Sequence, residues 1–591
     1  MKIDTIRHSL SHIMAHAVAD LFDKVNPVKS RKAGAAKPLF NRVKFGIGPT
    51  IENGFYYDFA LPSVASAKGE VAFKPEDLPR IEKRMKELIK KNIVFEKKLI
   101  SKPEAKKLFK GQLYKLDLIK ELKTKNATVY KSNNFTDLCS GPHVKSTKEI
   151  NPDAFKLVKI AGAYWRGDEK NPMLQRIYGV AFNTKKQLND YLKKQEQAEK
   201  RDHRILGQKL DLFHIDEEVG PGLVLWHPKG TVLKNVIEEF WSKEHIKNGY
   251  EIIDTPHIGR QKLWQTSGHT DFFKENMFGP MEVEGDKYLI KPMNCPFAAK
   301  IYKSQIRSYR DLPIRWAELG TVYRYERSGV LHGLTRVRGF TQDDAHTFCT
   351  PDQLSDEIIK TLRFGIKLLK AFGFKEYSIY LATRPKKYIG TVKDWQKATN
   401  ALKYGLNKEK LKYKIDAEGA IFYGPKIDIK IKDSLGREWQ CTTIQVDFNE
   451  PERFNLTYID KKGKKQKPIM IHRALLGSIE RFIAILLEHY AGALPFWLSP
   501  VQVYVIPVAN RHNKYAKQVA EQLEEKAVRV KLKDQNETVS KKIRDSELQK
   551  IPYMLVVGDK EMKSKSVRVR DRKKGDIGIK KVDSFIKKII K

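Results

Sequence analysis

Residues 322–340 of the chain read VYRYERSGVLHGLTRVRGF. The first five alternate as a strand does, a loop with Ser, Gly and His follows, and residues 335–340 alternate again. The pattern predicts a hairpin with Arg324 on one strand and Arg336 on the other. An arginine that rises from a strand can form a fork with a phosphate, and the nearby Glu326 can accept from an amino group. Arginines in strands more often form surface ion pairs, so the hairpin needs support from its surroundings.

The segments on either side of the hairpin supply that support. Upstream, residues 231–248 have the pattern of a helix, and residues 250–254 that of a strand ending before Pro256. Downstream, a strand over residues 468–471 leads into residues 477–481 (GSIER) and an apolar helix. The order is helix–strand–Pro, then Arg-x-Glu with its hairpin, then Gly-x-x-x-Arg on a helix. It resembles motifs 1, 2 and 3 of class II aminoacyl-tRNA synthetases.

Longer strings narrow the resemblance to threonyl-tRNA synthetase, in a form that lacks the N-terminal ubiquitin-like domain. They are KPMNCP at 291–296, RGFTQDDAH at 338–346, IHRALLGS at 471–478, HSxxH from His8, IGP at 47–49, GFYYD at 54–58 and AGAYWRGD at 161–168. The resemblance implies an α+β multidomain fold. Residues 1–200 would be an editing domain with a connecting helix, 201–498 a class II catalytic domain with an antiparallel sheet and helices, and 499–591 an α/β anticodon-binding domain.

The residues place similar boundaries independently. Residues 184–210 have the pattern of one charged, solvated connecting helix, and Pro495 and Pro500 bracket a second boundary. Beyond Pro500, strands alternate with helices, as in a compact α/β domain. Strands are predicted at 501–508, 529–533, 553–557 and 566–570, and helices at 514–526, 537–550 and 582–591. Residues 499–591 hold 24 Lys and Arg against 12 Asp and Glu, a net +12 that favours contact with a polyanion.

The family binds one catalytic Zn²⁺ per subunit through one Cys and two His. The matching positions are Cys295, His346 and His472, whose separations are too wide for any local metal pattern. Three protein ligands leave coordination positions open. Threonine can fill them with its amino and hydroxyl groups, whereas valine offers no hydroxyl, which is an effective way to reject it.

The resemblance also assigns the substrate sites. Threonine would meet Met293, Asp344, Tyr423, Thr443 and Gln445, with Asp344 holding the ammonium group. The ATP residues, with Mg²⁺ accompanying the nucleotide, would be Arg324 on the α-phosphate, Arg481 on the γ-phosphate, Glu326 on the adenine amino group, Arg336 near the reacting phosphate, and Gln440. His269 matches a position near the terminal ribose of the tRNA. Clamping and charge stabilisation would dominate catalysis.

A second constellation lies near the N-terminus. Residues 5–22 have the pattern of an amphipathic helix, and its His8, His12 and His16 follow at i, i+4 and i+8, which predicts one face. Cys139 and His143 form a later CxxxH of metal or acid–base type. Rejecting serine by one methyl group gives only about 1–3 kcal/mol, so a second, hydrolytic site is expected. The resemblance assigns it to His8, His12, Cys139 and His143, with Tyr57, Lys115 and Asp137 beside them. We interpret it as orienting a water, and leave metal binding open.

The remaining expectations concern partners and location. The anticodon-reading positions match Asn536, Glu561 and Arg570, the tRNA would be tRNA(Thr), and motif 1 implies a homodimer. The chain has 112 Lys and Arg against 71 Asp and Glu, a net +41 that favours nucleic acid over a membrane. The alternative explanation of this charge is that the protein comes from a Lys-rich proteome, in which surface charge keeps proteins soluble. Four cysteines without a CxxC pair, no secretion signal and no membrane-length apolar run predict a cytoplasmic protein.

Three alternatives stay open from sequence. The chain could be a catalytically dead RNA-binding paralogue, a standalone editing hydrolase, or a class II enzyme for another amino acid. The intact Cys295, Arg324, His346, His472 and Arg481 argue against the first, and the complete middle block argues against the second. The Cys/His/His set disfavours the third, by resemblance only. Two further departures from the family are an insertion at 28–43 and Phe297-Ala298-Ala299 where Gly-His is expected; residues 63–72 also have the composition of a flexible insertion.

Overall fold

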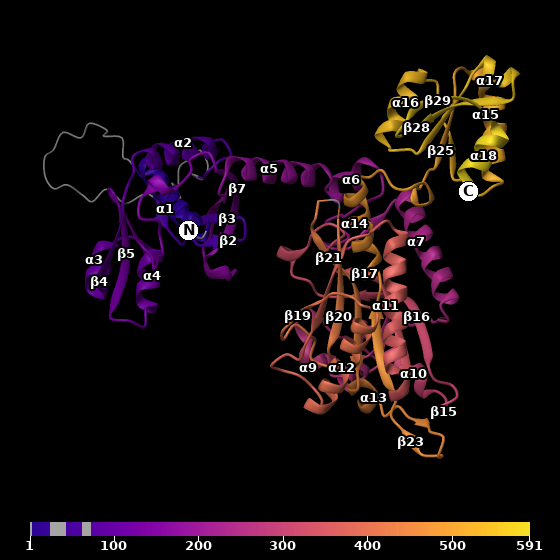
Figure 1. The fold of residues 1–591 in the computed structure, drawn as a ribbon, viewed down its shortest axis with the longest axis horizontal. Coiled ribbons are helices and arrows are strands. Elements are labelled where there is room, and N and C mark those ends of the chain that lie inside the picture. Colours follow the sequence, from indigo (N-terminus) through magenta and orange to yellow (C-terminus); the bar gives the residue numbers. More distant parts are fainter. Residues whose placement is uncertain (1–2, 24–42, 62–71, 434, 591) are drawn as a thin grey trace. The chain divides into compact units, whose positions relative to one another are not determined.

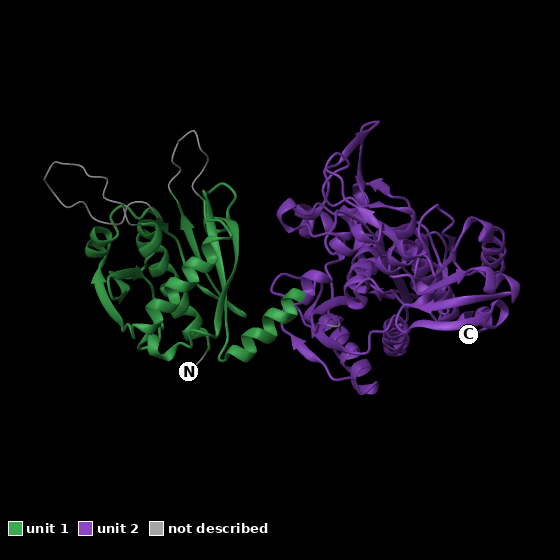
Figure 2. Cartoon of the chain, turned by 90° about the horizontal axis from the view of Figure 1, so that it is seen from above, with its two compact units in different colours: residues 1–196 green, residues 197–591 purple. Residues whose placement is uncertain are grey.

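The computed structural model describes residues 3–23, 43–61, 72–433 and 435–590 of the chain. These form two compact units, Met1–Glu196 and Gln197–Lys591 (Figure 2). The expected insertions at 28–43 and 63–72 lie almost wholly outside the described residues. The predicted boundaries at residues 200 and 498 stay predictions, because the chain divides once, within the connecting helix.

The first unit places one long helix on an antiparallel sheet. Helix α1 (Ile3–Phe22) packs on five strands in the order β1-β3-β8-β7, with β2 paired to β3. Leu10, Ile13 and Val18 of α1 are buried, so the apolar stripe that predicts the helix also holds it in place. A three-stranded sheet, β4-β5-β6, completes the unit. The other elements are β1 Lys44–Phe45, β2 Thr50–Ile51, β3 Gly54–Ala60, α2 Asp77–Lys90, β4 Phe95–Ser101, α3 Lys102–Leu108, α4 Leu113–Glu121, β5 Asn126–Ser132, β6 Phe135–Leu138, β7 Phe155–Tyr164 and β8 Met173–Ala181.

The connecting segment contains two helices, where the sequence analysis predicts one over 184–210. Helix α5 (Lys185–Lys200) buries only Leu188. The first helix then ends. The side chain of Asp202 accepts from the backbone N–H of Arg204 and so caps the start of a new helix, α6 (His203–Lys209). The prediction of a single helix is therefore wrong at the position of this cap.

The second unit is built on an eight-stranded sheet in the order β11-β16-β17-β24-β21-β20-β18-β19. It is antiparallel except for its edge pairs, β11–β16 and β18–β19. Helices α7, α11 and α14 share one hydrophobic core with the sheet (Figure 1). The strands are β11 Glu251–Ile252, β16 Ile314–Tyr323, β17 Gly339–Cys349, β18 Tyr377–Ala382, β19 Lys414–Asp416, β20 Lys426–Lys432, β21 Glu438–Asp447 and β24 Ile469–Ala474.

Smaller elements surround this sheet. The strands are β9 Phe213–His214, β10 Leu225–Trp226, β12 Ile258–Arg260, β13 Met281–Val283, β14 Asp286–Ile290, β15 Arg307–Ser308, β22 Tyr458–Ile459 and β23 Lys465–Gln466. The helices are α7 Pro228–Lys247, α8 Lys262–Ser267, α9 His269–Phe272, α10 Cys295–Lys303, α11 Leu354–Ala371, α12 Val392–Lys408, α13 Asn449–Arg453 and α14 Ile479–Tyr490. Among the described residues, no helix is both long and apolar enough to cross a membrane.

One buried carboxylate ties α7 to the centre of the sheet. Asp343 on β17 accepts from Trp241 Nε1 on α7 at 2.6 Å and from Arg473 Nη1 on β24 at 2.9 Å. It also accepts from the backbone N–H groups of Leu475 and Leu476, at 2.9 and 2.6 Å. The Asp343 side chain is completely buried. This residue therefore fixes the turn between β24 and α14.

The hairpin predicted at 322–340 exists, but its strands stop early. Strand β16 ends at Tyr323 and β17 begins at Gly339, so residues 324–338 form a loop, which we call the hairpin loop. The N–H of Arg338 donates to Gly222 O at 2.7 Å instead of to the opposite strand, so the pairing ends with the bond from Arg324 N–H to Arg338 O at 2.8 Å. Arg324, Glu326 and Arg336 are therefore loop residues, and the prediction that they lie on strands is wrong.

The C-terminal part has the predicted alternation of strands and helices. Its five-stranded sheet has the order β26-β25-β27-β28-β29 and carries a hydrophobic core of its own. The elements are β25 Val503–Pro507, α15 Asn513–Glu524, β26 Val530–Leu532, α16 Val539–Leu548, β27 Tyr553–Val557, α17 Asp559–Lys563, β28 Ser566–Asp571, β29 Gly575–Lys581 and α18 Val582–Ile590. Two of these elements were not predicted: α17, which is one short turn, and β29, whose two glycines weaken the strand pattern.

Candidate active site

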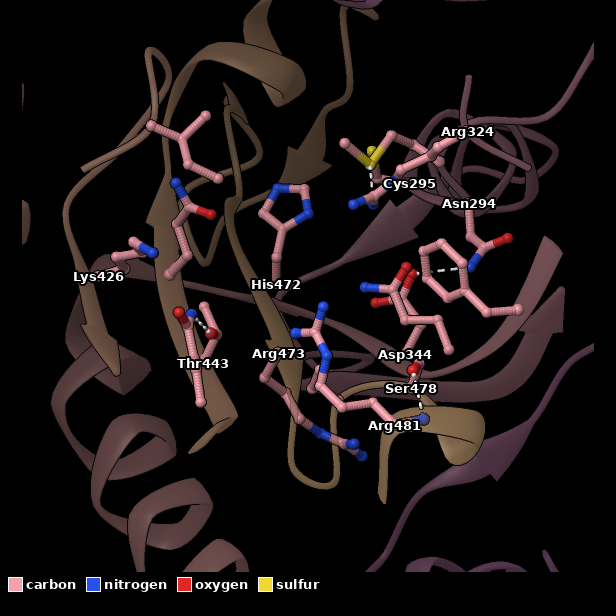
Figure 3. Close-up of a pocket in the computed structure, with 18 of the residues that line it drawn as sticks. Asn294, Cys295, Arg324, Asp344, Lys426, Thr443, His472, Arg473, Ser478 and Arg481 are labelled. Atoms are coloured by element: carbon pink, nitrogen blue, oxygen red, sulfur yellow. Dashed lines mark hydrogen bonds between the residues drawn. The ribbon is translucent and has the colours of Figure 1, made fainter. Parts of the chain in front are cut away.

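A pocket of about 330 Å³ opens over β17, β21 and β24. Every residue predicted for threonine, ATP or zinc lines it, and only His269 among the predicted catalytic residues does not. Figure 3 shows His472 in the middle, with Lys426 and Thr443 on one side and Cys295, Arg324 and Asp344 on the other. The sheet thus gathers side chains that are far apart in sequence.

The predicted zinc ligands converge in this pocket. Cys295 is the first residue of α10, His346 lies on β17 and His472 on β24, where the two histidines are register partners. The three side chains are buried, and one potential ligand atom from each lies within 4.8 Å of the other two. The sulfur–nitrogen–nitrogen donor set suits Zn²⁺. The Nδ1 atom of His346 is buried without a hydrogen-bond partner among the described residues, as a ligand awaiting a cation would be.

Two carboxylates that the sequence analysis missed stand behind these ligands. Asp447 Oδ2 lies 3.1 Å and Glu450 Oε2 3.6 Å from His472 Nε2. Burial alone would lower the pKa of His472, but the hydrogen bond with Asp447 and the nearby carboxylates raise it above its ordinary value. Burial lowers the pKa of His346 to about 4 and raises that of the Cys295 thiol well above its ordinary range. A carboxylate hydrogen-bonded to a ligating imidazole fixes the ring orientation.

The predicted ammonium partner lies beside the zinc ligands. Asp344 and His346 are two residues apart on β17 and therefore face the same side. Asp344 Oδ2 accepts from Asn294 Nδ2 at 3.0 Å, and Asp344 Oδ1 lies 3.7 Å from His346 Nε2. An oriented carboxylate in a buried site is a suitable partner for an amino group.

The other predicted threonine residues come from β21 and its surroundings. Gln445 is the register partner of His472 and donates to Gly424 O at 2.9 Å. The ring of Tyr423 lies 5.3 Å from that of His472. Thr443 Oγ1 donates to Asp428 Oδ1 at 2.8 Å. Gln440 Nε2, predicted for ATP, donates to the same oxygen at 2.9 Å.

Different kinds of contact orient the predicted ATP arginines. The guanidinium of Arg324 lies between the rings of Phe273 and Phe340, 5.4 and 5.1 Å from their centroids, and its Nη2 is 3.2 Å from Met293 Sδ. Arg481 Nε donates to Thr335 O at 3.0 Å. Cation–π contacts and a backbone carbonyl orient these groups and leave the remaining guanidinium N–H groups for a ligand.

Two predicted residues are in other surroundings than expected. Glu326, predicted to meet adenine, forms an ion pair with Arg336 at 3.0 Å. His269 is buried outside the pocket, where its Nδ1 lies 2.7 Å from Ser267 Oγ and its ring packs against the pocket residues Phe422 and Tyr423. Burial lowers the pKa of His269 to about 3, so the imidazole is neutral at physiological pH.

The N-terminal constellation also comes together. His8, His12, Cys139 and His143 each place one donor atom within 4.8 Å of the others. His16 does not join them, because eight residues along a helix turn the side chain by about 80°. Its Nε2 instead lies 2.8 Å from Asn134 Oδ1. The prediction that all three histidines share one face is therefore wrong for His16.

Hydrogen-bond partners fix the tautomers in this group. His8 Nδ1 lies 3.2 Å from Pro142 O, which can only accept, so its Nε2 is unprotonated and faces Cys139 Sγ at 3.2 Å. His143 Nδ1 lies 3.2 Å from Ser9 Oγ, whose own proton is given to Thr5 O at 2.9 Å. His143 Nε2 is then also unprotonated, 3.4 Å from Cys139 Sγ. The single S–H of Cys139 can donate to one of these two nitrogens, which leaves the other as a free acceptor that can orient a water.

The side chains predicted beside this group form a buried triad. Tyr57 donates to Asp137 Oδ2 at 2.6 Å, and Lys115 Nζ lies 2.6 Å from Asp137 Oδ1. Lys115 Nζ also donates to the Tyr57 hydroxyl at 3.0 Å. Asp137 Oδ2 is 3.6 Å from His12 Nε2, which links the triad to the histidines. Burial and Asp137 raise the pKa of Tyr57 well above its ordinary value, so the hydroxyl keeps its proton.

The three predicted anticodon positions differ in accessibility. Asn536 is exposed in the segment between β26 and α16. Arg570 on β28 is half-buried, 3.9 Å from Glu547. Glu561 is buried and accepts from the N–H of Gly558 at 3.0 Å, so its carboxylate caps α17.

Comparison with known proteins agrees with this arrangement. Residues 279–490 match the family described as tRNA synthetase class II core domain (G, H, P, S and T), residues 502–591 match an anticodon binding domain, and residues 127–178 match the threonyl and alanyl tRNA synthetase second additional domain. The threonine–tRNA ligase of Sulfurihydrogenibium sp. (strain YO3AOP1) is 52% identical over 99% of this chain and 88% of its own length. That of Dehalococcoides mccartyi (strain CBDB1) is 51% identical over 96% of this chain and 93% of its own.

A solved structure is similar as well. The crystal structure of the RNA binding domain of threonyl-tRNA synthetase from Cryptosporidium parvum Iowa II shares 43% identity and a TM-score of 0.63, over 66% of this chain and 97% of that one.

Proposed function

Because this chain belongs to the threonine–tRNA ligase family, we propose that the pocket around His472 is where it activates threonine with ATP. The expected resemblance and the multidomain α+β fold are confirmed. The protein is a threonine–tRNA ligase, which uses ATP with Mg²⁺ and tRNA. The observation that carries the residue assignment is the convergence of every predicted threonine, ATP and zinc residue on one pocket.

The proposed first step is an in-line displacement at the α-phosphorus of ATP. A threonine carboxylate oxygen forms the new bond, and the bond to the pyrophosphate oxygen breaks. Arg324 and Arg336 would neutralise the charge that gathers around the α-phosphate, and Arg481 would hold the γ-phosphate. Asp344 would bind the ammonium group, so that the carboxylate is aimed at phosphorus. Gln440 completes the ATP set, while Met293, Tyr423, Thr443 and Gln445 would shape the threonine side.

Cys295, His346 and His472 would hold the zinc ion. Bound there, Zn²⁺ supplies open coordination positions that favour an amino acid with a hydroxyl group. Asp447 would hold the His472 imidazole in its ligating orientation. His269 would act in the second step, the transfer to the terminal ribose of tRNA(Thr), where its Nε2, which has no hydrogen-bond partner among the described residues, would orient the ribose. Glu326 would exchange its ion pair with Arg336 for the adenine amino group.

The proposed hydrolysis of Ser-tRNA(Thr) takes place in the first unit. Cys139 would donate its S–H to one of His8 and His143, and the free nitrogen of the other would orient a water toward the seryl ester. Lys115, held by Tyr57 and Asp137, would place a positive charge close to the developing oxyanion. His12 connects the two groups through Asp137.

The remaining proposals concern the tRNA, the oligomer and the compartment. Asn536 and Arg570 would contact the anticodon, with Glu561 shaping the surface through the α17 cap. A homodimer would bury the α7–β11 edge, where Ile246 and Ile252 are 60% and 45% exposed. The four cysteines are free thiols, as in a reducing compartment, which supports the cytoplasm. We keep the division at residues 200 and 498 as the proposed domain boundaries.

Threonine-dependent ATP–pyrophosphate exchange tests the synthetic function. We expect exchange with threonine, weaker exchange with serine, none with valine, and about one zinc per chain in the same preparation. A folded, zinc-loaded protein that gives no exchange with threonine would contradict the proposal and favour a role in RNA binding without catalysis.

A further inference from the structure

Helix α14 carries two side chains that hold the hairpin loop. Arg481 and Glu488 are seven residues apart and therefore lie on the same face of the helix. Arg481 reaches the loop directly, through Thr335 O. Glu488 reaches it through His203, the first residue of α6, whose Nδ1 lies 2.7 Å from Glu488 Oε1. His203 Nε2 in turn accepts from the N–H of Leu334 at 3.0 Å.

The partners of His203 define its protonation. A carboxylate oxygen can only accept, so Nδ1 carries the proton, and a backbone N–H can only donate, so Nε2 does not. The imidazole is 1% exposed and is therefore a buried, neutral connector with both nitrogens used. Glu488 is held from its other side by Arg437 Nη2 at 2.5 Å and also accepts from the backbone N–H of His203.

Gly333 allows the hairpin loop to approach the His203 imidazole closely. A Cβ added to Gly333 would lie 2.1 Å from His203 Nε2, far inside contact distance. Gly333 also has φ +48°, in the left-handed region that favours glycine. The close approach lets the N–H of Leu334 reach Nε2. Three residues of the loop in succession, 333–335, are thus fixed by His203 and Arg481.

These contacts immediately precede Arg336. The backbone groups of Arg336 pair with those of His332 across the same tight turn, so a shift of Leu334 would move Arg336 with it. We infer that His203 and Glu488 are positioning residues that hold the hairpin loop, and with it Arg336, in place for ATP. The inference rests on the proposed function of this pocket. Neither residue lines the pocket, so they act through Leu334.

Two substitutions of His203 separate the loop contact from the contact with Glu488. His203→Gln places an amide oxygen near the position of Nε2 and can still accept from Leu334. His203→Asn is shorter, can donate to Glu488 and has no acceptor for Leu334. We expect His203→Asn to raise the dissociation constant of ATP, and its KM in exchange, by about tenfold, the effect of one lost buried hydrogen bond. His203→Gln should restore part of the affinity, because it keeps an acceptor for Leu334 but loses the support of Glu488.

Glycine substitutions in the loop test the same contact from its other side. Gly333→Ala should weaken ATP binding as His203→Asn does, and the double variant should be no weaker than either single one, because both break one contact. Gly329→Ala is the matched control, since a Cβ there meets no atom within 4 Å. It should bind ATP as the wild type does.

The readouts distinguish positioning from general damage. ATP binding is measured by calorimetry on the full-length protein, and KM for threonine, zinc content and thermal unfolding are measured beside it. The inference requires that only the constants for ATP change. Unchanged ATP binding in His203→Asn and Gly333→Ala, or an equal rise in KM for threonine, would overturn it. A wild type that itself lacks threonine-dependent exchange would instead refute the proposed function, and this inference with it.

Discussion

The imidazoles of His346 and His472 face each other as register partners on neighbouring antiparallel strands, with ring centroids 5.1 Å apart and planes at 87°. Strand pairing therefore sets the distance between two of the three proposed zinc ligands before any ion binds. Cys295 supplies the third from the start of α10. A site prepared in this way loses less conformational entropy when the metal binds.

Replacement of the thiol should remove the metal. We expect Cys295→Ser to contain no stoichiometric zinc and to lose threonine activation, because two histidines and a weaker oxygen ligand hold Zn²⁺ poorly. Elemental analysis and pyrophosphate exchange on the same sample measure both effects. Cys349→Ser, which also removes a buried thiol, should keep its zinc. A metal-free Cys295→Ser protein with full activity would refute the assignment.

The editing proposal predicts a separation of activities. His8→Ala combined with His12→Ala should leave the formation of Thr-tRNA intact and allow Ser-tRNA to accumulate, because the hydrolytic group lies in the other compact unit. Aminoacylation with labelled serine measures the product. His16→Ala, on the same helix but outside the group, should not mischarge. If the double variant mischarges no more than the wild type, the first unit does not edit.

Asp343 should be important for stability. Asp343→Asn removes the charge that compensates Arg473 in a fully buried position, and we expect it to lower the free energy of unfolding by about 3–5 kcal/mol. Denaturant titration measures this loss. The exposed Asp352→Asn should change stability little. A loss below about 1 kcal/mol would show that Arg473 finds another partner.

Glu480 should make stability depend on pH. Burial raises the pKa of this carboxyl from 4.5 to about 7, so between these pH values the folded protein binds a proton that the unfolded chain has lost. The stability contributed by this group is present below pH 4.5 and decreases as the pH rises toward 7, by up to about 3 kcal/mol. Relative to the wild type, Glu480→Gln should therefore gain stability over this interval. Parallel pH dependences of the two proteins would contradict the shifted pKa.

Local sequence patterns predicted the existence of helices and strands better than the residues at which they end. The helix at 5–22 and the C-terminal alternation of strands and helices were predictable, because each buries an apolar face with its own period. The hairpin strands were predicted too long. The side chains beyond Tyr323 keep the alternating pattern of a strand, but the backbone N–H of Arg338 donates to Gly222 O instead of to the opposite strand. No pattern within residues 322–340 indicates that one of their N–H groups bonds the carbonyl of Gly222, which is distant in sequence.

The pocket residues were predictable through resemblance rather than spacing. Cys295, His346 and His472 come from three elements that only the folded sheet brings together. Asp447, Glu450 and Ser9 were missed, because a carboxylate or hydroxyl that supports a histidine has no local signature. His16 was misplaced for a simpler reason, the rotation of a helix over eight residues.

The alternation of β17 has a consequence for how this protein can change. Gln342, Asp344 and His346 line the pocket, whereas Asp343, between them, is completely buried on the side of α7. Inserting or deleting a single residue within β17 would exchange the two faces of the strand. Asp343 would then point into the pocket, and Asp344 would point into the core. Length variation should therefore be tolerated only at the exposed tip of the hairpin loop, around Gly329, where neither this alternation nor the contacts of residues 333–336 constrain the chain. Within β17 no change of register should be tolerated.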